Sequence, residues 1–423
     1  MPFSKDAIEK NIIYTWRKAL DSSKDYKKTM AQPFKLFITA HGSFFLNTKG
    51  INGFNKILNE LKKDENIARK FSRRHLEELI RDVIIELLPT SPKKIVQEVR
   101  VKAAKLFSFL SQPEVDWLIL VPITNLEIRT RFLDVGNVRF SKFAKSTEKR
   151  IVANTKGNYR NLLSNDVLPK YRNAYVASVP VSAVDNTRAK ELALIAINDA
   201  VNVLRFYRLN SHFRNVNITR NNINTIGSLH KGDEVVLCLR NPPQYTQVIP
   251  FFEKIGFLVP LVINNKGRSA IRRDCFQALS HILKKKEHIR TDFEKRVLSA
   301  VHFCALSTCD NSVTNSFVNN MISLEALLIN GRESKSVNIS KRVALIVGKD
   351  IKQKKWLSRQ MRILYKIRSD IVHEGKNDLT QSDRNLLRMI NYATIISTLT
   401  IYHKEKFVSI SDLIKWCKCK KVS

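Results

Sequence analysis

The sequence predicts a mainly α-helical protein, with an α+β N-terminal region followed by a helical bundle in the C-terminal third. Two observations lead to this fold class. All 12 prolines lie at or before Pro260, and proline is the residue that breaks helices and marks loops. Runs rich in β-branched and aromatic residues, which are typical of strands, concentrate in the middle of the chain, at residues 115–128, 138–143, 174–179 and 234–239.

Residues 1–112 are predicted to be mainly helical. Ser4 is a candidate cap of the first helix, because an apolar stripe follows it at helical spacing: Ile8, Ile12, Trp16 and Leu20. Further helices are predicted over residues 55–61, 68–88 and 92–110. The next region is predicted to be α+β and to contain one long helix near residues 188–207.

The C-terminal region has the clearest helical pattern. Two helices are predicted over residues 293–307 and 313–330, the second ending before Gly331, and a short one over 339–347. A fourth is capped by Asp350 and runs towards Gly375, and a fifth begins at Thr380 or Ser382. Together these helices predict a bundle.

The chain carries 73 Lys and Arg against 38 Asp and Glu, a formal net charge of +35. The excess is spread evenly, because residues 291–423 have the same density of net charge as the rest. Such a field favours polyanionic partners such as RNA, DNA or an anionic membrane surface, without specifying which. With 43% hydrophobic residues, the chain is expected to fold rather than to remain disordered.

The length of 423 residues exceeds the roughly 250–300 residues at which a single core stops growing, so at least two domains are expected. We predict a mainly helical region (1–112), an α+β region with a sensing or regulatory role (113–290) and the helical bundle (291–423). No apolar run reaches the roughly 18–20 residues of a membrane span, and the N-terminus lacks an apolar signal core. A cytoplasmic protein with no membrane partner is expected.

Metal and cofactor sites are not indicated. The six cysteines are too sparse for a disulfide scaffold, and one residue between Cys417 and Cys419 is not the spacing of a zinc site. The motifs GxxxxGK[ST], HExxH and GxSxG are missing from the sequence, which argues against the common nucleotide hydrolases, metalloproteases and serine hydrolases. No metal and no cofactor is expected, and no group of residues in 1–290 indicates separate catalysis.

The fourth helix of the C-terminal region contains a conflict with its own apolar pattern. Continuing the stripe that ends at Met361 and Leu364 by one turn places Arg368 where a core residue is expected. Arginine is almost never fully buried without a partner. Either the stripe meets a carboxylate at this point, or it opens into a groove or interface that uses the charge. His373 follows five residues later.

This part of the sequence resembles a known family. The run LYKIRSDIVHEG (364–375) is similar to the Arg-x4-His motif of HEPN domains, and in particular of their Apea-like branch. The upstream segment SLEALL (323–328), centred on Glu325, is similar to the acidic helix of that branch. The resemblance covers about residues 291–410. Many HEPN domains have Asn, Asp or His directly after the Arg, whereas this chain has Ser369, with Asp370 one place later.

The resemblance implies a metal-independent endoribonuclease of bacterial defence, of the abortive-infection, antiphage or toxin type. Two HEPN bundles would dimerise and bring their Arg and His residues together. Arg368 would stabilise the phosphorane, His373 would transfer protons, and Glu325, Ser369 and Asp370 would support them. The implied partners are RNA and a second copy of the chain. A further partner, which comes from a phage or from the same defence system, would act as the trigger.

The residue types agree with this chemistry. Metal-free cleavage of RNA needs a base for the 2′-hydroxyl, an acid for the leaving oxygen and positive charge near the phosphorane. Histidine changes its charge near neutral pH, which suits proton transfer, and a guanidinium can bind two phosphoryl oxygens at once. On a straight helix, a spacing of five places Arg368 and His373 about 140° apart. Either the helix unwinds before His373, or the working site is composite.

An alternative gives both residues a structural role. Arg368 would pair with Glu325 of the neighbouring helix, and His373 would lie at the C-terminus of its own helix, where the dipole favours a cation. The bundle would then be a non-catalytic nucleic-acid-binding or adaptor module that only dimerises. We expect catalysis, because the chain retains both residues of the motif.

Two further places are candidates for nucleic-acid contacts. Lys366 lies within the HEPN-like motif. Arg205, Arg208 and Arg214 alternate with aromatic residues, a composition that suits base stacking and phosphate binding. For these arginines we favour a simpler interpretation, a helix end whose aromatic residues pack inward while its arginines face solvent.

Overall fold

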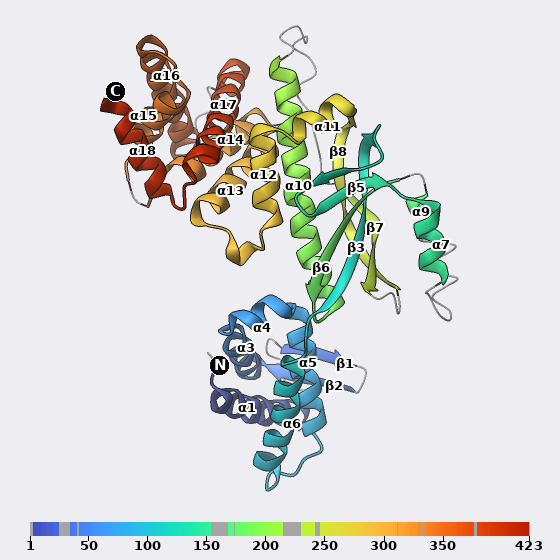
Figure 1. The fold of residues 1–423 in the computed structure, drawn as a ribbon. Helices are drawn as coiled ribbons and strands as arrows, with labels where there is room; N and C mark the ends of the chain where they lie inside the picture. Colours follow the sequence, from blue (N-terminus) through green and yellow to red (C-terminus); the bar gives the residue numbers. More distant parts are fainter. Residues whose placement is uncertain are drawn as a thin grey trace. The chain divides into compact units, whose positions relative to one another are not determined.

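The computed structural model of the chain describes residues 3–24, 34–39, 42–153, 168–172, 174–214, 230–241, 246–310, 312–331, 333–375 and 379–422. It is mainly α-helical, with a small sheet and a C-terminal region built of helices (Figure 1). The predicted fold class is therefore confirmed. Within the described ranges, none of the helices combines the length and the apolar composition that crossing a bilayer requires.

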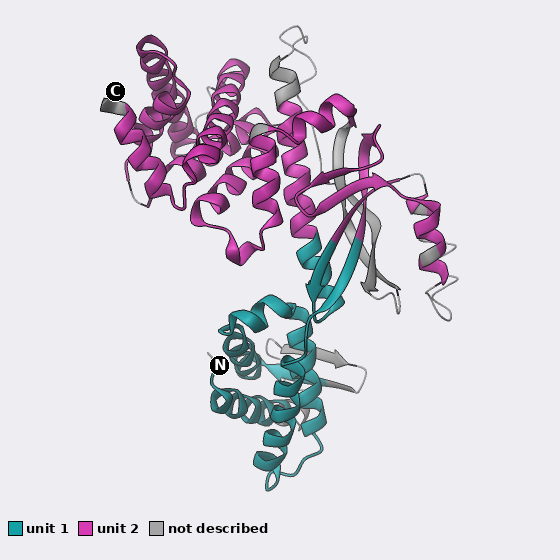
Figure 2. Cartoon of the chain, viewed as in Figure 1, with its two compact units in different colours: residues 1–119, 180–193, 238–247 teal, residues 120–179, 194–237, 248–423 magenta. Residues whose placement is uncertain are grey.

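The chain divides into two compact units (Figure 2). Unit 1 comprises residues 1–119, 180–193 and 238–247, and unit 2 comprises residues 120–179, 194–237 and 248–423. The chain passes between them within regular elements rather than in separate linkers. The region boundaries near residues 112 and 290 stay a prediction.

Unit 1 begins with helices around an apolar core. Its elements up to residue 110 are α1 (Lys5–Lys24), β1 (Phe34–Thr39), β2 (Gly42–Asn47), α3 (Thr48–Lys62), α4 (Glu65–Lys70), α5 (Arg73–Leu87) and α6 (Ile95–Leu110). The first helix starts as predicted, because Oγ of Ser4 accepts a hydrogen bond from the backbone N–H of Ala7 at 3.2 Å. Ile8, Ile12 and Trp16 of its stripe are buried in the core. The side chain of Leu20 lies outside the described residues.

Two features of unit 1 differ from the prediction. The antiparallel pair β1–β2 lies in a segment expected to be helical; its runs FKLFIT and GSFFLN are rich in aromatic residues, which favour strands. The single helix expected over residues 68–88 is two helices, α4 and α5. The break occurs because Ser72 caps α5, with its Oγ accepting from the backbone N–H of His75 at 3.0 Å.

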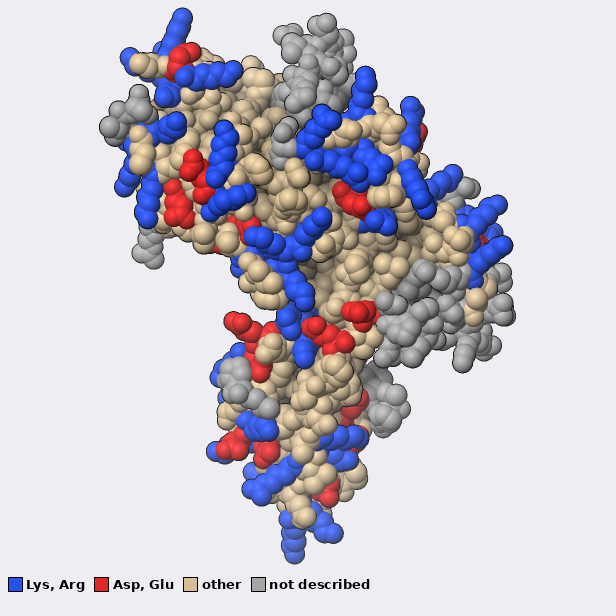
Figure 3. Space-filling view, in the orientation of Figure 1, with Lys and Arg blue, Asp and Glu red and all other residues tan. Residues whose placement is uncertain are grey.

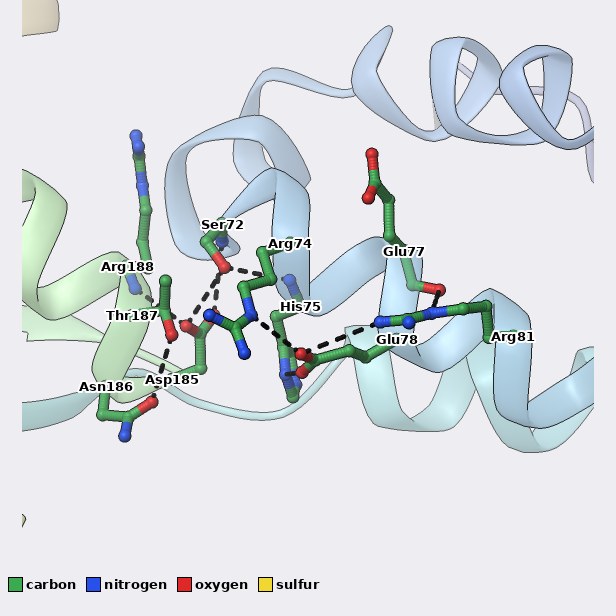
Figure 4. Close-up of polar contacts among 10 residues, drawn as sticks. All are labelled: Ser72, Arg74, His75, Glu77, Glu78, Arg81, Asp185, Asn186, Thr187 and Arg188. Carbon is green, nitrogen blue, oxygen red and sulfur yellow. Dashed lines mark hydrogen bonds and ion pairs between the residues drawn. The ribbon is translucent and has the colours of Figure 1, made fainter. Parts of the chain in front are cut away.

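The N-termini of α5 and α10 (Asn186–Arg214) share one cap in unit 1 (Figure 4). The buried carboxylate of Asp185 accepts hydrogen bonds from the N–H of Ser72 at 3.2 Å, from Oγ of Ser72 at 3.3 Å, and from the N–H of Arg188 at 2.8 Å. The side chain of Arg188 adds a bond from its Nε to the carbonyl of Arg69 at 2.9 Å. A single carboxylate thus satisfies donors at the starts of two helices.

A six-stranded sheet follows in the order β4-β5-β6-β3-β7-β8, and β3 also pairs in parallel with β8. Its strands are β3 (Val115–Ile128), β4 (Leu133–Val135), β5 (Val138–Lys142), β6 (Tyr175–Ala183), β7 (His230–Asn241) and β8 (Thr246–Ile263), with the helices α7 (Lys145–Ala153) and α9 (Leu168–Tyr171) between β5 and β6. Four strands lie where the sequence predicts them, whereas β4 and β8 were not predicted.

The C-terminal region is helical throughout its described residues. Its elements are α11 (Asn265–Ile271), α12 (Asp274–Lys284), η2 (Glu287–Ile289), α13 (Asp292–Ser307), α14 (Val313–Leu328), α15 (Lys335–Val347), α16 (Ile351–Ser369), η3 (Asp370–Glu374), α17 (Gln381–Glu405) and α18 (Ile410–Val422). The five predicted helices correspond to α13–α17. Thr380 caps α17 together with Asp383 in a capping box. The helices α11, α12 and α18 were not predicted.

Buried polar side chains fix the packing of α13, α14 and α17. Oγ of Ser323 donates to the carbonyl of Ala300 at 2.7 Å and lies 3.0 Å from Oδ1 of Asn391. Nδ2 of Asn391 donates in turn to Oδ1 of Asn320 at 2.9 Å. Because a buried polar group without a partner is costly, this network favours one register of the three helices. It thereby places α14, the helix that carries Glu325.

Candidate functional site

The predicted site lies at the C-terminal end of α16. The carboxylate of Asp350 caps this helix by accepting from the backbone N–H of Gln353 at 2.8 Å. The predicted apolar stripe is buried down to Leu364. Arg368 occupies the next position of the stripe, and its side chain is only 17% exposed. A guanidinium thus occupies the last position on the buried side of the helix.

Glu325 of α14 is the carboxylate that the stripe meets. Nε of Arg368 lies 3.6 Å from its Oε1, and the hydroxyl of Tyr365 donates to the same oxygen at 3.3 Å. Nζ of Lys335 lies 2.7 Å from its Oε2. Of the two alternatives for Arg368, a carboxylate partner or an open groove, the structure shows the first. Burial and the nearby Glu325 raise the pKa of Tyr365, which keeps its hydroxyl a donor.

The contact between Arg368 and Glu325 is an ion pair without a hydrogen bond, because 3.6 Å is too long for one. Nε of Arg368 is buried and has no hydrogen-bond partner in the described part of the chain. Its Cζ lies 5.9 Å from the centre of the Tyr365 ring. Within the described ranges, no residue accepts a hydrogen bond from this guanidinium. Glu325 and Tyr365 therefore hold the charge in place, while the donors of the guanidinium make no hydrogen bond within the described residues.

The helix does not continue as an α-helix to His373. Residues Asp370–Glu374 form a π turn, in which the N–H of Gly375 donates to the carbonyl of Asp370, and Gly375 has a φ of 66°. A π turn contains more residues than an α-helical turn, so each residue advances by less than 100°. His373 therefore lies closer to the Arg368 side of the helix than the expected 140°. Of the two alternatives raised by the spacing, an altered helix end is present. A composite site stays a prediction.

His373 is exposed in this turn. Among the residues that the structure describes, none forms a hydrogen bond or an ion pair with its imidazole. Ser369 and Asp370, predicted to support the site, are half-buried at the junction of α16 and the π turn. The structure therefore brings Arg368 and Glu325 into contact and leaves His373 accessible five residues further along the chain, in the π turn.

The other predicted nucleic-acid contacts have different environments. Lys366 is exposed on α16. Arg205 is buried, and its guanidinium donates to Oδ1 of Asn202 at 3.1 Å, so it is not accessible to a nucleic acid. Its burial also differs from the solvated arginine that we favoured. Phe206 does pack inward, Arg208 is half-buried, and the side chain of Arg214 lies outside the described residues.

Two residues of the site were not predicted from the sequence. Tyr365 lies one turn before Arg368 inside the HEPN-like motif, so the helical period indicates a neighbour of Arg368 at this position. Lys335 begins α15, ten residues after Glu325 and on another helix. No spacing rule connects Lys335 with Glu325, and only the packing of α14 against α15 brings them together.

Lys and Arg side chains are scattered over the visible face of each unit and outnumber the acidic side chains there (Figure 3). The structure thus agrees with the even spread of charge along the sequence. In the described residues there is no cluster of three His, Cys, Asp or Glu side chains with the arrangement of a metal site.

Comparison with known proteins adds no family to this description. No family model, no curated protein and no solved structure matches the chain. The functional argument therefore rests on the residues at the end of α16.

Proposed function

We propose that the protein is a metal-independent endoribonuclease of bacterial defence, of the abortive-infection, antiphage or toxin type, that acts in the cytoplasm. One observation carries the proposal. Arg368 is held by Glu325 and Tyr365 with its hydrogen-bond donors unused, directly before a π turn that carries the accessible His373. π turns are rare and are often found at functional sites. A fixed cation beside an accessible imidazole is the pair that RNA cleavage without a metal needs.

In the proposed reaction, the imidazole of His373 accepts the proton of the 2′-hydroxyl while the 2′-oxygen attacks phosphorus. The P–O5′ bond breaks, and the O5′ atom takes a proton from the imidazolium of a second copy's His373. The products are a 2′,3′-cyclic phosphate and a 5′-hydroxyl. The guanidinium of Arg368 stabilises the charge that develops on the phosphoryl oxygens, and Glu325 orients the guanidinium.

A homodimer is part of the proposal, because one His373 cannot be base and acid in the same step. Two bundles would supply two copies of Arg368 and His373 to one composite site. The remaining α+β part of the chain would sense a trigger, recruit a partner or restrain the nuclease. The trigger would be a partner that comes from a phage or from the same defence system. No metal or other cofactor takes part in the proposed reaction.

The experiment that tests this function is end-mapping of cleaved RNA. The purified full-length protein is incubated with total bacterial RNA in EDTA, and 2′,3′-cyclic phosphate ends are sequenced. We expect discrete ends with the wild type and none with His373→Ala. The matched control is His403→Ala, which removes an exposed histidine from the last turn of α17. Equal cleavage by wild type and His373→Ala would refute the assignment.

The ion pair between Arg368 and Glu325 also fits a second function, a non-catalytic nucleic-acid-binding or adaptor protein whose bundle only dimerises. In that case the pair contributes to packing alone. Expression in bacteria separates the two functions. The nuclease is expected to slow growth, conditionally on its trigger, and both Arg368→Ala and His373→Ala are expected to relieve this effect. The adaptor predicts no effect of either substitution on growth.

A further inference from the structure

One face of α16 is both basic and aromatic. Every charged residue of this helix is Lys or Arg. Seven exposed side chains, spaced by three and four residues, lie on one face of the helix: Lys352, Lys355, Trp356, Arg359, Arg362, Ile363 and Lys366. We call this set the α16 face. It is about 21 Å long, from the helical rise over its ends, and its last member, Lys366, lies one turn before the π turn that carries His373.

Within the described residues, the cations of the α16 face lack acidic partners. In the described part of the chain, no carboxylate lies within ion-pair distance of any of its five Lys and Arg side chains. This contrasts with unit 1, where Arg73 and Arg74 pair with Glu77 and Glu78 one turn later. The α16 face therefore carries an uncompensated positive charge, which favours a polyanion.

The aromatic and apolar members of the α16 face are exposed to solvent to an unusual degree. Trp356 is 48% exposed and Ile363 is 46% exposed, although neither is part of the buried stripe. The helix packs mainly against α15 (Figure 1), and its buried residues Leu357, Met361 and Leu364 lie on the opposite side. A flat indole among cations is the arrangement on which the bases of a single strand stack while phosphates bind the charges. Paired bases are stacked on each other and cannot use it.

We infer that the α16 face binds single-stranded RNA, with a base stacked on Trp356 and phosphates on the surrounding Lys and Arg, and directs the strand to His373. This inference rests on the proposed ribonuclease function and names its substrate class. Five phosphate contacts predict that the logarithm of the association constant falls with the logarithm of salt concentration with a slope of about −3.5.

The test measures binding separately from cleavage. The full-length His373→Ala protein is titrated into a fluorescent oligoadenylate of about 12 nucleotides, within the range of single-strand sites, and into the same strand in a duplex. Adding Trp356→Ala should weaken single-strand binding about tenfold and leave duplex binding unchanged, whereas Trp356→Phe should retain most of the affinity. The matched control is Trp416→Ala, on α18, which should bind like the parent protein.

The charges are tested by the salt slope. Replacing Lys355 and Arg359 with Ala should reduce the magnitude of the slope by about 1.4, or about 0.7 for each lost contact. The exposed pair Lys415 and Lys418 on α18, replaced in the same way, should leave the slope unchanged. Equal changes in both double variants would overturn the assignment to the α16 face.

Other occupants of the face give different results. If Trp356→Ala abolishes binding to phosphatidylcholine vesicles containing phosphatidylserine and leaves RNA binding intact, the face is a membrane surface and the inference is wrong. If it converts a dimer to a monomer in sedimentation without weakening RNA binding, the occupant is a second copy and the inference is also wrong. Unchanged single-strand binding by Trp356→Ala overturns it directly.

These outcomes are separate from those of the proposed function. A wild-type protein that binds single strands through Trp356 but leaves RNA uncut refutes the nuclease and retains the binding face. A protein that cuts RNA equally well with and without Trp356 retains the nuclease and refutes the binding face.

Discussion

Nε of Arg368 lies 3.6 Å from Oε1 of Glu325, and both side chains are largely covered, at 17% and 13% exposure. The pair is close enough to orient the guanidinium but too long to use its hydrogen bonds. Glu325 also accepts from Tyr365 and contacts Lys335. One carboxylate therefore organises three side chains from two other helices, α15 and α16.

Replacing Glu325 with Gln tests whether this orientation matters. The variant keeps the size of the side chain and an acceptor for Tyr365 but removes the charge next to Arg368. We expect RNA cleavage to fall at least about tenfold, because a transition-state contact is displaced, while the free energy of unfolding falls by about 1–3 kcal/mol, because the largely covered Arg368 loses its charged partner. Lys335→Ala leaves the pair with Arg368 intact and is expected to cleave normally. Full activity of Glu325→Gln would show that Arg368 needs no orientation.

A substitution at Gly375 tests whether the π turn contributes to RNA cleavage. Its φ of 66° is in the left-handed region, and an added Cβ would meet no atom within 4 Å. The cost of Gly375→Ala, about 1–2 kcal/mol, is therefore conformational rather than steric. Gly331 is a matched control, with a φ of 59° and equally open space. Chemical unfolding should show similar losses for both Ala variants, and RNA cleavage should fall for Gly375→Ala alone. If both variants cleave RNA like the wild type, the π turn is not part of the site.

A substitution at Asp185 tests the cap that α5 and α10 share in unit 1. Because its carboxylate serves the starts of both α5 and α10, Asp185→Ala should destabilise both helices by about 2 kcal/mol. Hydrogen exchange followed by mass spectrometry should then report faster exchange in peptides from both. Among the described helices, the buried Asp64 caps α4 alone, so Asp64→Ala should destabilise that helix by about 1 kcal/mol. Faster exchange in only one of α5 and α10 after loss of Asp185 would contradict the shared cap.

The pH dependence of stability has a candidate source in Asp199. Burial raises the pKa of this carboxyl to about 6, although Arg290 lies 3.7 Å away and opposes the shift. The folded protein therefore binds the proton more tightly than the unfolded chain, so this group's contribution to stability is full below about pH 4 and is lost as pH rises to about 6. Relative to Asp199→Asn, the wild type should lose about 2–3 kcal/mol over this range in chemical unfolding. Parallel pH profiles for the two proteins would refute the shift.

Local chemistry predicted most of the helices. In the region of the candidate site, Asp350 and Thr380 cap α16 and α17 as expected, because an N-cap depends only on a side chain and the backbone two or three residues later. The break at Ser72 obeys the same rule and was missed because the apolar pattern continues across it. The pair β1–β2 was missed because two short runs in helical surroundings carry little periodic signal.

The environment of each charged side chain was harder to predict. Arg205 and Arg368 both lie on helices with a buried apolar side, yet the first is buried beside Asn202 and the second pairs with Glu325 at the edge of the bundle. Burial depends on which helices pack together, and this is not a property of one segment.

The sequence by itself determined the helical C-terminal region, the net positive charge and the Arg-x4-His spacing, because these depend on residue type and order along the chain. The tertiary structure decided that Glu325, Tyr365 and Lys335 meet at Arg368, and that a π turn brings His373 towards the same side. It also decided that Trp356 stays exposed among cations. These relationships depend on how α14, α15 and α16 pack against one another, and the free energy of that packing comes from residues distant in sequence.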